Sequence, residues 1–333
     1  MNQLAKSLIG RLFGATLLPF LLRRKLVIFT FHRVLTTQEY ANCRFEKSIT
    51  VTDTGLASFL HHIKQHFDII PLSQLTVESH NSPSENNKPQ AVITFDDGWR
   101  DNYTLGLPLF RQYQIPATVF LSTAYIDSPL GFWWQHLGEM LTAANLNENQ
   151  RQAIKDLILQ TLGKPPALLQ QEFNDVDALI HIIKRDHYDQ AIELTQAIAR
   201  LTNTELRPHG LSWEECREMS EHGIEFGSHT LNHPRLSLLQ GDKLKTELAD
   251  SKQRIIAQNI NYVDAICYPY GDYNQAVVNE SQRNYRIGLT TNSGIVAQNQ
   301  RVSLTLPRIN VSEQVARHIG LLNYRLLKAA VKG

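Results

Sequence analysis

The sequence predicts an α/β fold built on a mostly parallel sheet or barrel, and three observations support this. The chain has 333 residues, of which 42% are hydrophobic and 20% charged, so it can bury a core and is not disordered. Short apolar, β-branched runs alternate with helical patterns, as in parallel strands connected by helices. The length suits two domains, or one large domain with an insertion.

The composition excludes several classes of protein. The formal net charge is only +1, from 33 basic and 32 acidic residues, which argues against a nucleic-acid partner. Three scattered cysteines, Cys43, Cys216 and Cys267, are too few for a disulfide framework or a structural zinc site made of cysteines. A soluble α/β enzyme is therefore the expected class.

Strands and helices can be assigned in order along the chain. Residues at helical spacing between positions 56 and 67 predict a helix that connects the first two strands. Ser212 with Glu215 is typical of a capping box, Gly223 ends that helix, and Lys243 to Asn259 predicts another. The expected strands are Leu26–Phe31, Ala91–Phe95, Ala117–Leu121, Ile224–Gly227, Ala265–Tyr268 and Ile287–Thr291.

Residues from about 133 to 208 break this alternation. They contain only helical patterns, around Ala153–Leu162, Val176–Ile183 and Ala191–Leu201. We interpret this stretch as a helical insertion that could roof a site.

Both ends of the chain are basic and apolar. Residues 1–38 contain six basic residues and no acid, and the uncharged run Leu12 to Leu22 has eleven residues, too few to span a bilayer. Basic residues follow this run where a signal peptide would have its cleavage site. We expect residues 1–25 to form a basic amphipathic segment and residues 313–333 a basic helix, both suited to an anionic membrane surface. The alternative is two terminal helices that pack on the domain.

These ends also suggest a location. We expect a cytoplasmic protein or one peripheral to the inner membrane; the alternative is an exported protein with an uncleaved N-terminal anchor.

Four expected strands end in chemically special residues. His32 follows the first strand, Asp96 and Asp97 follow the second, His229 with His233 follows a later one, and the segment YPYG, residues 268–271, follows another. In (β/α) barrels the loops at the carboxyl ends of the strands converge on the active site. We therefore expect these residues to form one site.

One carboxylate and two imidazoles, from Asp97, His229 and His233, form a set that binds a divalent cation and leaves positions open. The HxxxH spacing puts both imidazoles on one side of a helical turn, and Pro234 favours a turn or a frayed helix end there. The alternative is a solvent-facing histidine pair.

Adjacent carboxylates repel each other, and a cation on Asp97 would remove much of that cost and leave Asp96 free as a base. The alternative is an Asp-Asp-Gly turn that caps a helix, with Gly98 making the turn.

The motifs TFDDG (94–98), SHTLNHP (228–234) and YPYG (268–271) resemble the first three motifs of the polysaccharide deacetylases, carbohydrate esterase family 4, with its NodB-homology domain. The similarity spans about residues 26–310. It implies a distorted (β/α) barrel of the NodB-homology type over residues 26–312, with the helical insertion. It also implies metal-dependent hydrolysis of N-acetyl groups on aminosugar polymers.

The resemblance also implies roles for individual residues. Asp96 would be the general base, Asp97, His229 and His233 would hold one divalent metal, and the backbone N–H of Tyr270 would stabilise the oxyanion. Zinc is the expected ion, although two histidines and one carboxylate also accept Co²⁺, Ni²⁺ or Mn²⁺.

Two departures from the family pattern suggest substitutes. The third motif commonly opens with an arginine that orients the base, but Cys267 stands there, and no later motif supplies an acid histidine. His32, in FHRV, resembles the early acid histidine of the circularly permuted members that deacetylate poly-N-acetylglucosamine. We hypothesise that Arg308, in LPRINV, replaces the missing arginine; the alternative is an ordinary surface or helix-capping arginine.

Aromatic residues near the motifs have two interpretations. Trp99 beside the aspartates, and Phe132, Trp133 and Trp134 at the start of the insertion, could stack on sugar rings. A run of three aromatics is more often a buried anchor. Cys267 is interpreted as a small core residue rather than a nucleophile.

Together these features predict a hydrolase that removes N-acetyl groups from a polysaccharide or a lipid-linked glycan, with an Asp base and a His acid. One alternative is a glycan-binding relic of the fold without turnover. The other is a two-His, one-carboxylate iron oxygenase, which the alternation of strands and helices disfavours because such oxygenases are all-β proteins.

Overall fold

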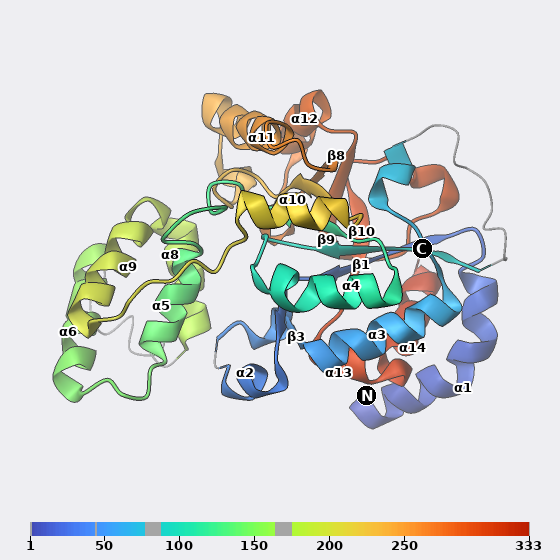
Figure 1. Cartoon of the computed structure of the whole chain (residues 1–333), viewed down its shortest axis with the longest axis horizontal. Coiled ribbons are helices and arrows are strands. Elements are labelled where there is room, and N and C mark those ends of the chain that lie inside the picture. Colours follow the sequence, from blue (N-terminus) through green and yellow to red (C-terminus); the bar gives the residue numbers. More distant parts are fainter. Residues whose placement is uncertain (1, 44, 77–87, 164–174, 333) are drawn as a thin grey trace. The chain divides into compact units, whose positions relative to one another are not determined.

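A closed barrel of parallel strands is the central feature of the computed structural model, which describes residues 2–43, 45–76, 88–163 and 175–332 (Figure 1). The strand order is β1-β10-β9-β8-β7-β6-β5, and β5 pairs back with β1 to close the ring. This confirms the expected distorted (β/α) barrel. The strands are β1 (Leu26–Phe31), β4 (Asp68–Ile69, added beside β5), β5 (Gln90–Phe95), β6 (Thr118–Leu121), β7 (Glu225–Ser228), β8 (Tyr262–Cys267), β9 (Ile287–Ser293) and β10 (Leu306–Asn310). A separate small sheet pairs β2 (Arg33–Leu35) with β3 (Thr50–Thr52).

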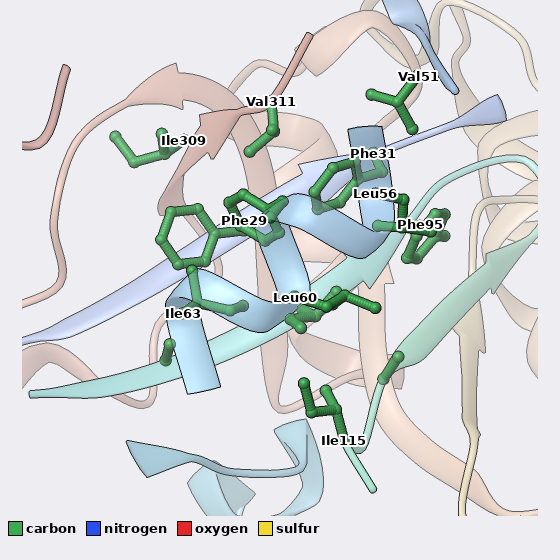
Figure 2. Packing of buried hydrophobic residues seen from close by; sticks show 14 of the residues in the cluster. Phe29, Phe31, Val51, Leu56, Leu60, Ile63, Phe95, Ile115, Ile309 and Val311 are labelled. Atoms are coloured by element: carbon green, nitrogen blue, oxygen red, sulfur yellow. The ribbon is translucent and has the colours of Figure 1, made fainter. Parts of the chain in front are cut away.

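Alternate residues of each barrel strand face opposite sides, as the pleat requires. In β1, Phe29 and Phe31 point outward onto α3 (Asp53–His66), where their rings each lie 5.0 Å from that of Phe59 (Figure 2). Leu26 and Ile28 instead belong to the cluster of apolar residues inside the barrel. The even-numbered positions of β1 therefore face inward, and His32 continues that series beyond the strand.

Helices connect the strands and cover the outside of the barrel. The capping box expected at Ser212 and Glu215 is present at the start of α10, since each side chain bonds the backbone N–H of the other residue. Besides α3, the helices that accompany the barrel are α1 (Gln3–Leu21), α4 (Leu107–Tyr113), α10 (Trp213–Glu221), α11 (Gly241–Ile256), α12 (Gln275–Asn284), α13 (Glu313–Arg317) and α14 (Ile319–Lys332). A short helix, α2 (Thr37–Asn42), follows β2.

The two terminal helices, α1 and α14, lie side by side (Figure 1). Their backbones approach closely, because a Cβ atom on Gly10 would lie 1.8 Å from the carbonyl oxygen of Gly320. Gly14 faces Asn323 in the same way. Within the described residues, no helix combines the length and the apolar character that crossing a membrane requires.

The chain divides into two units. The barrel unit comprises Met1–Ala41, Ser48–Ile126 and Leu211–Gly333, and the second unit comprises Asn42–Lys47 and Asp127–Gly210. The second unit is helical: the three expected helical patterns form α6 (Glu148–Leu162), α8 (Val176–Asp186) and α9 (Tyr188–Thr202), preceded by α5 (Trp133–Leu141). Residues 164–174 of the expected insertion lie outside the described residues.

The aromatic run at the start of the second unit is buried. Phe132 and Trp133 are 0% exposed and Trp134 is 2% exposed. The two indole rings pack edge to face, with centroids 5.7 Å apart. These rings therefore form a core anchor of the unit and present no open face to a sugar.

Candidate active site

The polar residues that follow the barrel strands meet at the carboxyl end of the barrel. Asp96 and Asp97 follow β5, His229 follows β7, and His32 follows β1. Arg308 lies within β10, a strand that the sequence analysis did not assign. The parallel direction of all the strands puts these positions at one end, as in other (β/α) barrels.

Asp97, His229 and His233 form a buried group with the geometry of a metal site. The Nε2 atoms of both histidines lie 3.3 Å from Oδ1 of Asp97, and the three residues are 2–6% exposed. Ligand atoms of a tetrahedral zinc ion at bond lengths of about 2.0–2.1 Å lie about 3.4 Å apart. The residues present therefore fit a divalent cation.

Neighbouring groups orient all three of these side chains. The backbone carbonyl of Cys267 lies 2.7 Å from Nδ1 of His229, and the hydroxyl of Tyr270 lies 3.1 Å from Nδ1 of His233. The indole N–H of Trp99 donates a 2.8 Å hydrogen bond to Oδ2 of Asp97. Such contacts direct Nε2 of each histidine and Oδ1 of Asp97 toward a common centre.

The loops that carry these residues have unusual backbone conformations. Asp97, Thr230, His233 and Tyr270 have φ values of +77°, +69°, +59° and +60°. Side chains other than glycine rarely adopt this region, and such strain is concentrated at functional sites. The two imidazoles lie on an irregular loop rather than on a helical turn, in keeping with the effect expected from Pro234.

Arg308 holds Asp96 through a bidentate ion pair. Its Nη1 and Nη2 atoms each donate a 2.7 Å bond to one carboxylate oxygen of Asp96. Its other donors bond the Thr290 carbonyl, the Thr94 hydroxyl and the Cys267 sulfur, so this 1% exposed guanidinium has its five donors satisfied. The arginine comes from β10 rather than from the position of Cys267, where the family motif would have it.

The two carboxylates stay ionised for different reasons. Burial alone would raise the pKa of Asp96, but Arg308, His32 and His229 outweigh it and lower this pKa to about 2. Burial opposes ionisation of Asp97 as well, but hydrogen bonds with His229 and His233 hold its pKa well below the usual value. Each carboxylate thus has its own cationic or hydrogen-bonding partner, and the cost of placing two side by side is offset. Burial raises the pKa of Cys267, as expected for a core thiol.

His32 lies at the open side of the site. Its Nε2 atom is 3.7 Å from Oδ2 of Asp96, and its side chain is 21% exposed. Its Nδ1 atom is buried and has no hydrogen-bond partner in the part of the chain that the structure describes. His32 can therefore reach both Asp96 and a molecule that enters from solvent.

Trp99 is buried beside the site rather than open to solvent. Stacking on a sugar ring was one interpretation of this residue, but it is 0% exposed, and its indole lies under the guanidinium of Arg33, whose Cζ is 4.4 Å from the ring centroid. A fully buried ring has no free face for a sugar. Its contribution to the site is the hydrogen bond to Asp97.

Glu247, on α11, was not identified from the sequence. Its carboxylate accepts hydrogen bonds from the backbone N–H groups of Leu231 and Asn232 at 3.0 and 2.9 Å. It thereby fixes the loop between His229 and His233. An acidic residue on an expected surface helix gave no signal of this contact.

The barrel resembles those of solved deacetylases. A Streptococcus pyogenes structure, the deacetylase PplD in complex with acetate, matches with a TM-score of 0.55 and 23% identity over 92% of this chain and 98% of that one. IcaB from Ammonifex degensii matches with a TM-score of 0.56 and 14% identity over 90% and 97% of the two chains. At these identities the likeness supports the fold alone.

Sequence comparison identifies the family. The Bacillus subtilis (strain 168) protein YxkH, which is named for polysaccharide deacetylases, is 33% identical over 105 residues, or 31% of this chain and 37% of the length of YxkH. The sequence model described as Polysaccharide deacetylase matches residues 84–287, which include all three motifs. The chain therefore belongs to the polysaccharide deacetylase family.

Proposed function

We propose that the chain is a metal-dependent N-deacetylase that acts on N-acetylated aminosugars of a polysaccharide or a lipid-linked glycan. One observation carries the proposal: the three candidate ligands Asp97, His229 and His233 adjoin a second carboxylate, Asp96, which an arginine orients. A bound cation alone could have a purely structural role. A buried, ionised carboxylate next to it can act as the base that hydrolysis needs.

The proposed chemistry divides among the residues of the site. A divalent cation held by Asp97, His229 and His233, with zinc as our proposed ion, would polarise the acetyl carbonyl and lower the pKa of water. Asp96 accepts the proton of the attacking water, and Arg308 keeps this carboxylate ionised and pointed in one direction. The backbone N–H of Tyr270 donates to the developing oxyanion.

The departing amine needs a proton, and His32 is the residue proposed to supply it. Its Nε2 atom lies near Asp96, its side chain is partly open to solvent, and its buried Nδ1 has no described partner. Asp96 and His32 thus provide a base and an acid on one site, and the products are a free amine and acetate.

Two alternative functions are less well supported. An iron oxygenase with the same ligands would be expected in an all-β fold, whereas this chain forms a barrel of parallel strands and helices. A glycan-binding relic would not need a fully bonded arginine on Asp96, because binding a sugar requires no oriented base.

The test is acetate release from N-acetylglucosamine oligomers by purified protein with added zinc. We expect the wild type to release acetate and Asp96→Asn to release about 10²–10⁴-fold less, because the amide cannot act as the base. Asp242→Asn is the matched control, since that side chain is 97% exposed and lies outside the site. Equal rates for Asp96→Asn and the wild type would contradict the mechanism. If zinc binds but no oligomer releases acetate, acetate release from crude glycolipid extracts distinguishes an enzyme with a lipid-linked substrate from a relic.

We also propose that α1 lies on an anionic membrane surface, which would make the protein peripheral to a membrane. One side of α1 packs on α14 through Gly10 and Gly14, whereas large apolar side chains elsewhere on the helix are 44–80% exposed: Leu4, Leu8, Leu12, Phe13, Leu17 and Phe20. Residues 1–38 contain six basic residues and no acidic ones. An exposed apolar face in a segment whose charged residues are all basic is complementary to anionic lipid.

Sedimentation with vesicles tests this second proposal. We expect binding to vesicles that contain phosphatidylglycerol, weaker binding to pure phosphatidylcholine, and release at high salt. The double variant Leu8→Ser/Leu12→Ser should lose binding, whereas Leu238→Ser should not, because Leu238 is equally exposed at 61% but lies elsewhere. Equal binding by both variants would contradict the proposal, and so would light scattering that shows the face buried in a dimer.

A further inference from the structure

A second group of potential metal ligands lies in the helical unit. It consists of His136 and Glu139, one turn apart on α5, and His209, from the segment that follows α9. A nitrogen or oxygen from each residue lies within 4.8 Å of the other two. All three residues belong to the second unit and are separate in the sequence from the barrel motifs.

The His209–Glu139 distance in this group fits a tetrahedral cation, and all its ligand atoms lie within 4.8 Å of one another. Nε2 of His209 lies 3.3 Å from Oε2 of Glu139, the same separation as in the His–Asp pairs of the barrel site. The rings of His136 and His209 have centroids 4.6 Å apart. About 3.4 Å is expected between two ligand atoms of one zinc ion.

Neighbouring groups orient the ligand atoms here as well. His136 is 3% exposed, and the backbone carbonyl of Leu130 accepts a hydrogen bond from its ring, while its Nε2 has no partner within the described residues. Nδ1 is therefore the donor, which leaves the Nε2 lone pair available to a metal. Gln135 donates a 2.7 Å bond to Oε1 of Glu139, and Oε2 is the oxygen next to His209.

We propose that His136, Glu139 and His209 form a second divalent-cation site, of the zinc class, with solvent completing the coordination. An ion pair between His209 and Glu139 would explain their 3.3 Å contact, but it would leave the buried Nε2 of His136 unsatisfied. A cation satisfies that nitrogen as well as the carboxylate.

The site would join the two ends of the helical unit. Gly131, before α5, has φ +55°, and a Cβ atom there would lie 2.9 Å from the backbone nitrogen of His209. The chain entering the unit and the chain leaving it therefore run in contact. A cation shared by α5 and His209 would hold this junction together, and its role would be structural.

Metal content measured on the full chain tests the proposal. After removal of metal, exposure to Zn²⁺ and desalting, we expect two zinc ions per wild-type chain. His209→Ala and His233→Ala should each hold one, and the double variant none. His66→Ala is the matched control, and this variant should still hold two zinc ions. His66 belongs to another histidine pair, in which its ring centroid lies 4.3 Å from that of His62.

Two further measurements separate the second site from the first and from misfolding. In a His233→Ala background, Zn²⁺ should raise the melting temperature, and adding Glu139→Gln, which keeps the side-chain shape, should abolish that rise. Cobalt in the same background should give the visible absorption of a tetrahedral ion. If the wild-type chain held one zinc, and that zinc were lost in His233→Ala but kept in His209→Ala, the second site would be refuted and the proposed barrel site supported. The reverse pattern would overturn the barrel site alone.

Discussion

The barrel unit and the helical unit each contain one carboxylate and two imidazoles, but in different surroundings. Both barrel histidines lie 3.3 Å from Asp97, and His209 lies 3.3 Å from Glu139. In the barrel, the Asp97 side chain is 6% exposed, whereas the Glu139 side chain is 50% exposed. The barrel ligands follow two strands of a closed sheet, whereas the others come from one helix and one segment without regular secondary structure. The two sites thus offer a cation similar donors with different access to solvent.

The comparison shows that the groups around a metal site determine what it can do. Beside Asp97 lies a second ionised carboxylate, Asp96, bonded by Arg308, with His32 at 3.7 Å. Among the described residues, no further carboxylate, imidazole or thiol joins the three ligands of the second cluster. We therefore expect a cation in the barrel to take part in chemistry and a cation in the helical unit to stabilise structure.

The largest expected contrast is between Asp97→Ala and Glu139→Ala. Loss of the barrel carboxylate should reduce acetate release by about 10³-fold or more, because charge stabilisation at the carbonyl is lost. Loss of Glu139 should change the rate less than about tenfold and should lower the zinc-dependent melting temperature instead. Rate and melting curves measured on both variants check this. A similar fall in rate for both would break the distinction between the two sites.

Replacing the basic side chain of a buried ion pair should also lower the unfolding free energy by different amounts in the two units. Arg308→Met leaves the Asp96 charge buried without its partner and should cost about 3–5 kcal/mol of unfolding free energy. In the helical unit, Lys184 makes a 3.1 Å contact with Glu46, whose side chain is 18% exposed, so Lys184→Met should cost about 1–2 kcal/mol. Urea unfolding of both variants at pH 7 gives the two values.

The pH dependence of the same measurement provides the control. Because the folded pKa of Asp96 is about 2, below the usual 3.8, its contribution is present above about pH 4 and is lost as the pH falls toward 2. The difference in unfolding free energy between the wild type and Arg308→Met should therefore shrink over that range. A deficit that stays constant between pH 6 and pH 2.5 would mean that the substitution acts through packing.

Much of the barrel site could be predicted from sequence because its residues directly follow apolar strands. Parallel strands bring their carboxyl ends together, so Asp96, Asp97, His229 and His32 could be grouped without knowing any long-range contact. Arg308 was a hypothesis only, since its side chain points inward from the middle of a strand whose pattern, with a proline, was not assigned.

The features that were missed depend on packing between distant segments. A sugar-facing Trp99 was one of two interpretations, and its position on the buried side of the Asp-Asp-Gly turn depends on the surrounding core. Glu247 lies on α11, which follows the histidine loop in the sequence, and it bonds back to that loop. The second cluster joins His136 and His209 across most of the helical unit, and neither residue follows a strand or a known motif.

His32 tests whether the barrel site separates chemistry from metal binding. His32→Ala should lower turnover by about 10²-fold, because the amine leaves without a positioned acid, while zinc content stays at the wild-type value. His222→Ala, an exposed histidine of the same unit, is the control. Near-wild-type turnover would refute the role of His32 as the acid, and loss of zinc would instead make it a ligand.

The smallest expected difference concerns the hydrogen bond that each ligand carboxylate receives. Trp99→Phe keeps a buried aromatic ring but removes the N–H bonded to Asp97, and such losses lower metal affinity about 10–100-fold. Gln135→Met removes the donor to Glu139, but water can replace that bond because the Glu139 side chain is half exposed, so we expect less than about a threefold change. Competition with a chromophoric chelator, in His209→Ala and His233→Ala backgrounds respectively, isolates each site. Equal losses would mean that solvent access does not govern how strongly the neighbouring donor acts on the metal.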